Sequence, residues 1–133
     1  MAAGIYDFTI EQGTTINFEI QYRDNRNYPI DLTNYQGRMQ IRPFIGATSS
    51  YITLSSSLDD TFTGINFSGS NNSLPPSSGS IAIQISATSS SVLDWSIPAY
   101  YDLEIYSGSG ANTQVTRVIQ GRVRLSKEVT LTP

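Results

Sequence analysis

The chain has 133 residues, a length typical of one domain, and only 14% of its residues are charged. It contains neither Cys nor His, which excludes disulfides, thiolate nucleophiles, His-based catalytic triads and ordinary zinc sites. Eight basic against eleven acidic residues give a net charge of −3, so no basic surface suited to nucleic acid is expected. These counts favour a single domain over residues 1–133 that is not an enzyme and has no cofactor or metal.

No signal peptide is expected from the first residues of the sequence. Residues Met1–Asp7 lack the basic and apolar regions of a signal peptide, and no apolar run approaches the length of a membrane span. We therefore expect a protein that is made in a cytoplasm and has no membrane partner.

Alternation of apolar and polar residues, the pattern of half-buried strands, dominates the sequence. In chain order, the predicted strands are Ile5–Ile10, Ile16–Tyr22, Arg38–Arg42, Tyr51–Leu54, Gly64–Ser68, Ile81–Ile85, Tyr101–Tyr106, Val115–Arg122 and Val123–Leu131. Turn-forming residues at Asp24–Asn27 and Ser107–Asn112 separate neighbouring strands. The last two segments are expected to form one long strand interrupted near Gly121, where Val118 leaves the alternation and indicates a β-bulge.

Only the segment Ala87–Trp95 favours a helix, because serines that can cap a helix N-terminus precede two turns at most. The prediction is therefore an all-β fold: a single antiparallel β-sandwich, immunoglobulin-like or related, with one short helical turn around residues 88–95. A closed barrel of the same strands is the alternative, since periodicity does not separate the two.

Acidic pairs are the first candidates for chemistry. Asp59 and Asp60 offer oxygen ligands for Ca²⁺, but no spaced series of ligands follows them, so a solvated turn is the favoured interpretation. Asp102 and Glu104 share one face of a strand at a separation that suits a glycosidase. That face is directed away from the apolar residues of the strand, which disfavours a catalytic role.

Arginines on predicted strands are candidates for an interface, because the guanidinium group pairs with carboxylates at two points. Their side chains are expected on the outer face of a sheet. The favoured interpretation is cross-strand pairing with Glu19, Asp102 or Glu104. The alternative is docking to another protein through Arg38, Arg42, Arg122 and Arg124.

Aromatic residues near the only Trp provide a further hypothesis. Trp95, Tyr100 and Tyr106 would suit contacts with a glycan if their rings were exposed. The favoured interpretation is that Trp95 and Tyr101 instead close the end of the sandwich core.

The run Ile30–Pro43, with the sequence IDLTNYQGRMQIRP, resembles a stretch of short virion structural proteins of tailed phages, notably contractile-tailed phages of cyanobacteria. It is also similar to the N-terminal β-domain of phage baseplate upper proteins. The opening Tyr6–Gly13 and the ending Gln120–Thr130 fit the same pattern. The resemblance implies an immunoglobulin-like or related sandwich that assembles into a particle, and it implies no activity, cofactor or catalytic residue.

The leading functional hypothesis is a non-enzymatic structural component of a phage virion, in its tail, baseplate or neck. Its expected partners are other virion proteins and further copies of the same chain in a homo-oligomer. The alternatives are a capsid decoration protein on the phage head and a carbohydrate-binding module for the host surface.

Overall fold

The computed structural model describes residues 3–130, whose strands form two sheets. The larger sheet is formed by β1 (Gly4–Ile5), β2 (Phe8–Glu11), β4 (Gln36–Arg42), β5 (Ile52–Ser55), β8 (Ala99–Ser107) and β9 (Gln114–Ser126). The smaller sheet is formed by β3 (Ile16–Gln21), β6 (Gly64–Asn66) and β7 (Ser80–Ile85). Three short helical segments complete the chain: η1 (Pro76–Ser78), α1 (Ala87–Ser91) and η2 (Gly110–Asn112). Each predicted strand segment contains a strand, but the segment Ile5–Ile10 is divided between β1 and β2, and the last two predicted segments form the single strand β9.

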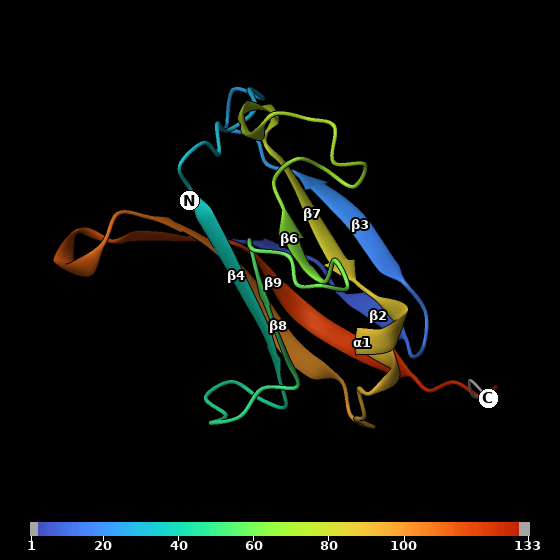
Figure 1. Cartoon of the computed structure of the whole chain (residues 1–133). Coiled ribbons are helices and arrows are strands. Elements are labelled where there is room, and N and C mark those ends of the chain that lie inside the picture. The colour runs from blue at the N-terminus through green and yellow to red at the C-terminus, as the bar shows by residue number, and fades with distance from the viewer. Residues whose placement is uncertain (1–2, 131–133) are drawn as a thin grey trace.

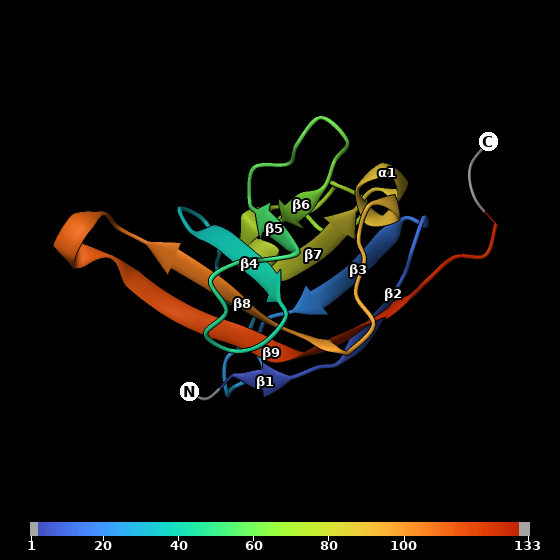
Figure 2. The same cartoon turned by 90° about the horizontal axis from the view of Figure 1, so that it is seen from below.

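The two sheets stack as the layers of a sandwich (Figures 1 and 2). The larger sheet has the order β1-β9-β8-β4-β5, with β2 also paired to β9, and the smaller has the order β3-β7-β6. Taken in chain order, β3 to β9 match strands B, C, C′, D, E, F and G of an immunoglobulin-type sandwich. Within residues 3–130 no strand of one sheet pairs with a strand of the other. The predicted immunoglobulin-like sandwich is therefore confirmed, and the barrel alternative is wrong.

The core lies between the sheets, where the apolar positions of the alternating strands meet. Ile81, Ile83 and Ile85 of β7 are buried, and so are Leu103 and Ile105 of β8. Burial of a side chain of this size contributes roughly 1.5–3 kcal/mol relative to exposure. In β8 the alternation thus also identifies the side of the strand that stabilises the fold, whereas in β7 Ala82 on the opposite side is buried as well.

The prediction of an entirely antiparallel sandwich is wrong for the two N-terminal strands. Both β1 and β2 run parallel to β9, whereas every other strand pair is antiparallel. Between β1 and β2 the chain crosses Gly121, and a Cβ there would collide with the Tyr6 carbonyl oxygen. The Asp7 carboxylate beside it accepts a hydrogen bond from the Arg122 backbone N–H at 2.8 Å. Gly121 therefore permits close approach of two backbones.

Strand β9 is continuous, so the expected interruption near Gly121 is wrong. The register between β8 and β9 shifts between Leu103 and Glu104, which pair with Ile119 and Arg117. Val118 is thus the extra residue of a β-bulge, and for this reason Val118 and Ile119 are both buried. Beyond Ser126 the predicted strand does not continue, and its end at Leu131 lies outside the described residues.

Helix α1 begins where the sequence indicates and ends earlier than expected. The Ser86 hydroxyl accepts a hydrogen bond from the Ser89 backbone N–H at 3.1 Å, the N-cap interaction predicted for a serine. The helix ends at Ser91 because Leu93 and Trp95 are both buried. Residues two apart point in different directions on a helix but to the same side of an extended chain. No helix among the described residues has the length and apolar character needed to cross a membrane.

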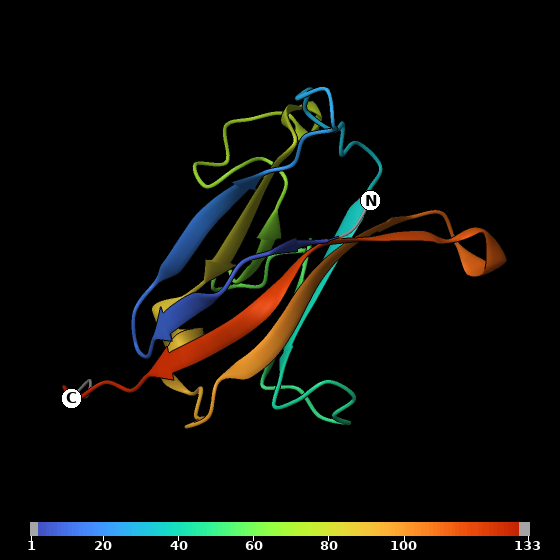
Figure 3. The same cartoon turned by 180° about the vertical axis from the view of Figure 1, so that it is seen from behind.

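The hairpin that joins β8 to β9 extends beyond the body of the sandwich (Figures 1 and 3). Its tip contains η2 and the turn predicted at Ser107–Asn112. Next to the tip, residues 114–117 of β9 are exposed. The larger sheet therefore presents an extended outer surface, and its middle part carries the groove described next.

Candidate functional site

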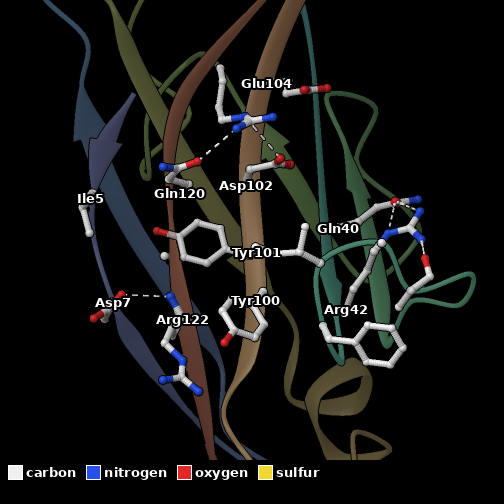
Figure 4. A pocket seen from close by; sticks show the side chains of 16 residues that line it. Ile5, Asp7, Gln40, Arg42, Tyr100, Tyr101, Asp102, Glu104, Gln120 and Arg122 are labelled. Atoms are coloured by element: carbon white, nitrogen blue, oxygen red, sulfur yellow. Dashed lines mark hydrogen bonds and ion pairs between the residues drawn. The ribbon is translucent and has the colours of Figure 1, made fainter. Parts of the chain in front are cut away.

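A groove of about 690 Å³ lies on the outer face of the larger sheet. Figure 4 shows Arg42 and Gln40 on the β4 side of this groove, Arg122 on the β9 side, and Tyr100 between them. The loop after β4 supplies exposed apolar side chains, Phe44 at 59% and Ile45 at 83% exposure. We call this surface the sheet groove, and it combines arginine, aromatic and aliphatic groups in the manner of protein interfaces.

Arg38 lies on the same face as the groove and is paired within the chain. Its Nε is 2.8 Å from Glu104 Oε1, and its guanidinium lies 4.8 Å from the centre of the Tyr106 ring. This ion pair joins neighbouring residues of β4 and β8, whose register places them opposite each other. Of the four candidate arginines, Arg38 thus fits the interpretation of cross-strand pairing within the sheet.

Arg42 and Arg122 line the groove without an ion-pair partner among the described residues. The Arg42 Nε donates to Gln40 Oε1 at 3.0 Å, and another of its nitrogens donates to the Ala47 carbonyl. The Arg122 guanidinium lies 5.0 Å from the centre of the Tyr100 ring. Both cations are therefore held in position by neutral groups, and their charge is not balanced by a carboxylate contact.

The carboxylates of the groove are already engaged. Asp102 Oδ2 lies 3.3 Å from Arg117 Nε, and Glu104 pairs with Arg38. Burial raises the pKa of Asp102, with the charge of Glu104 acting in the same direction and nearby arginines opposing it. The predicted pairing with Asp102 and Glu104 is present, but for Glu19 it is wrong. Glu19 belongs to the smaller sheet and accepts a hydrogen bond from the Ser70 backbone N–H at 3.0 Å.

Arg124 is separated from the other three candidate arginines. It lines a second hollow together with Thr9 of β2 and with Ser96 and Pro98. The structure therefore brings Arg42 and Arg122 together in the sheet groove, places Arg38 on the same face and leaves Arg124 outside it.

The three aromatic residues proposed for glycan contact do not form an open platform, and this prediction is wrong for Trp95. Trp95 is 5% exposed, stacks on Tyr51 with ring centres 4.7 Å apart, and donates its indole N–H to the Val123 carbonyl at 3.2 Å. Arg122 lies over Tyr100 and Arg38 lies over Tyr106. The favoured interpretation, in which Trp95 and Tyr101 belong to the core, is confirmed.

The acidic turns are organised by hydrogen bonds of their own. Asp59 accepts from Thr61 and Thr63 backbone N–H groups at 2.8 and 3.0 Å, and Asp31 accepts from the Thr33 N–H at 2.9 Å. These bonds and those from the threonine hydroxyls lower the pKa of both carboxyl groups. In residues 3–130 no group of three or more acidic residues is placed to hold a metal ion.

Phe44 and Ile45 are the part of the groove that sequence reasoning missed. In the sequence, the only indication of their role is that two large apolar residues lie between Pro43 and Gly46. These flanking residues favour a turn, where a large apolar side chain is not needed for the core. The predicted arginines supply the other walls.

Comparison with known proteins identifies no family. No family model and no curated protein matches the chain. Among solved structures, it is similar to a chicken T-cell receptor chain, with 14% identity and a TM-score of 0.47. The matched region covers 96% of this chain and 56% of the receptor chain.

Proposed function

We propose that the chain is a non-enzymatic protein–protein assembly module and a structural component of a phage virion, in its tail, baseplate or neck. The observation that carries the assembly role is the sheet groove, where Arg42 and Arg122 lack carboxylate partners among the described residues. Arginine and aromatic side chains of this kind dominate the energetics of protein interfaces.

The placement in a phage particle rests on the resemblance of Ile30–Pro43 to virion proteins. In this segment Leu32 is buried and forms the corner before β4, and the Asp31 carboxylate bonds to Thr33. A Cβ at Gly37 would lie 3.1 Å from the Phe67 ring, so a larger residue there would require the ring to shift slightly. The motif therefore has an architectural role. It supports a relationship between this sandwich and those of virion proteins, and it identifies no particular binding partner.

The function is tested by restoring the chain to particles that lack it. Purified particles are analysed by mass spectrometry after complementation with wild type, Arg122→Glu or Arg124→Glu. We expect wild type and Arg124→Glu to be incorporated and Arg122→Glu to be lost, since only Arg122 lines the groove. The Arg124 variant is a matched control because it carries the same charge change on the same strand.

Two results would contradict the proposal. Absence of the wild-type chain from purified particles would exclude a virion role, and normal incorporation of Arg122→Glu would remove the groove from the docking surface. Cryo-EM of the intact particle then separates the tail location from the alternative, a decoration protein on the head.

A further inference from the structure

The loop between β5 and β6 presents an exposed aromatic side chain. Phe62 is 70% exposed and has a φ of 65°. A large side chain rarely adopts the left-handed region, and such conformations are maintained where the surrounding structure fixes them. Asp59 and Asp60 precede this residue and give the segment two negative charges. We call Asp59–Thr63 the Phe62 loop.

Hydrogen bonds hold the Phe62 loop in this conformation. The Phe62 N–H donates to the Asp59 carbonyl at 2.9 Å, and the Asp59 N–H donates to the Thr63 carbonyl at 3.0 Å. The Thr63 hydroxyl lies 3.2 Å from the Ser86 hydroxyl and accepts from the Ser86 backbone N–H, which ties the loop to the start of α1. The phenyl ring is therefore displayed by an ordered segment, so binding requires little further ordering.

The sheet groove is complementary to this loop in two respects. Phe44 and Ile45 offer an apolar surface for a phenyl ring, while Arg42 and Arg122 offer two cations without carboxylate partners among residues 3–130. The groove volume of about 690 Å³ accommodates an aromatic side chain together with its neighbours. No residue of the Phe62 loop lines the groove of its own chain.

The distribution of charge favours another copy of this chain as the occupant. The groove lining carries three arginines and three carboxylates and is neutral, and two of these arginines, Arg42 and Arg122, have no carboxylate partner among the described residues. The net charge of −3 of the chain therefore lies outside the groove, and Asp59 and Asp60 of the Phe62 loop contribute to it. A second copy that approaches with its acidic loop is therefore attracted to the groove face.

The geometry points to self-association in which the Phe62 loop of one copy inserts into the sheet groove of the next. This inference rests on the proposed assembly role and names the partner. Phe62 packs on Phe44 and Ile45, and the Asp60 carboxylate meets Arg122. In a head-to-tail contact one copy supplies its loop and the next copy its groove, which leaves one free loop and one free groove at the ends. Repetition of the contact produces a closed ring or a filament.

Analytical ultracentrifugation of the full chain over a range of concentrations tests this inference. We expect wild type to form species larger than a dimer. Loss of an aromatic anchor at an interface weakens binding by about thirtyfold or more, so Phe62→Ala and Arg122→Glu should each remain largely monomeric. Phe62→Asn is added because asparagine tolerates a positive φ, which separates loss of the ring from loss of loop structure.

A mixture of Phe62→Ala and Arg122→Glu provides the decisive measurement. One variant retains an intact groove and the other an intact loop, so the mixture should form a 1:1 dimer and nothing larger. Ile97→Ala, at a residue 77% exposed, and Arg124→Glu, outside the groove, are matched controls that should assemble like wild type.

Three outcomes overturn the inference: a monomeric wild type at every concentration, Phe62 variants that assemble normally, or a mixture that stays monomeric. A monomeric wild-type chain that is nevertheless found in purified particles would leave the proposed function standing. Self-association of a chain that is absent from particles would reject the virion role alone.

Discussion

The clearest quantitative expectation concerns Trp95, whose contacts can be removed in steps. Its indole is 5% exposed, stacks on Tyr51 at an angle of 17° and donates a hydrogen bond to Val123. Replacement by Phe retains an aromatic ring beside Tyr51 but removes the indole N–H and part of the packed surface. A net hydrogen bond contributes about 0.5–1.5 kcal/mol, so we expect Trp95→Phe to lower the free energy of unfolding by about 1–2 kcal/mol.

Trp95→Ala removes the whole ring and leaves a cavity between the sheets. Truncation of a buried Trp to Ala typically costs about 3–5 kcal/mol, against a total stability of about 5–15 kcal/mol for a domain. At this chain length each kcal/mol corresponds to a shift in Tm of about 3–5 °C. The Ala variant should therefore melt at least about 10 °C below wild type.

Urea unfolding followed by far-UV circular dichroism measures both variants, because they lack the only Trp and hence its fluorescence. Tyr28→Ala, at an exposed aromatic residue, is the control and should change stability by less than about 0.5 kcal/mol. In wild type, Trp95 fluorescence should be blue-shifted and unaffected by host glycans. A loss below about 1 kcal/mol in Trp95→Ala would refute the assignment of Trp95 to the core.

Three further predictions follow from the larger sheet. Gly121→Ala should lower the free energy of unfolding by about 1–3 kcal/mol and accelerate hydrogen exchange in β1, because its Cβ would strike the Tyr6 carbonyl. Unchanged hydrogen exchange would contradict the close approach of the chain to Gly121. A double-mutant cycle with Arg38→Ala and Glu104→Ala should give a coupling below about 1 kcal/mol, as both side chains are partly exposed, and a larger coupling would refute this. Burial raises the pKa of Tyr101 above 10.0, so folding favours its protonated form. The contribution of Tyr101 should leave stability unchanged below about pH 10 and lower it above that pH, so in the alkaline range Tm should depend less on pH in Tyr101→Phe.

The strands were predictable because alternation is a local property. Successive side chains of a strand point to opposite faces, so the polar residues on either side of Ile16 or Leu103 in the sequence indicate that these two residues face the core. The bulge at Val118 was detectable for the same reason, since it breaks the alternation. The parallel pairing of β1 and β2 was not, because parallel and antiparallel strands of this kind carry the same pattern.

The candidate site was predictable in part. The sequence places Arg42 and Arg122 on the outer side of their strands, but which residues face them depends on strand order. Glu19 has the same alternation as Glu104 and lies on the other sheet. Likewise, nothing local distinguishes Phe62 from a core phenylalanine, because its exposure follows from hydrogen bonds that close its loop.

The parallel pairing of the N-terminal strands has a mechanical consequence. Since β2 runs parallel to β9, the start of one and the end of the other lie at opposite ends of the same pair. Tension applied between these points acts along the strands, so the backbone hydrogen bonds of the pair are loaded in shear and share the force. An antiparallel pair loaded at one end would instead open one bond at a time. Tension along these strands of the larger sheet is therefore expected to meet more resistance than tension that opens an antiparallel pair from one end.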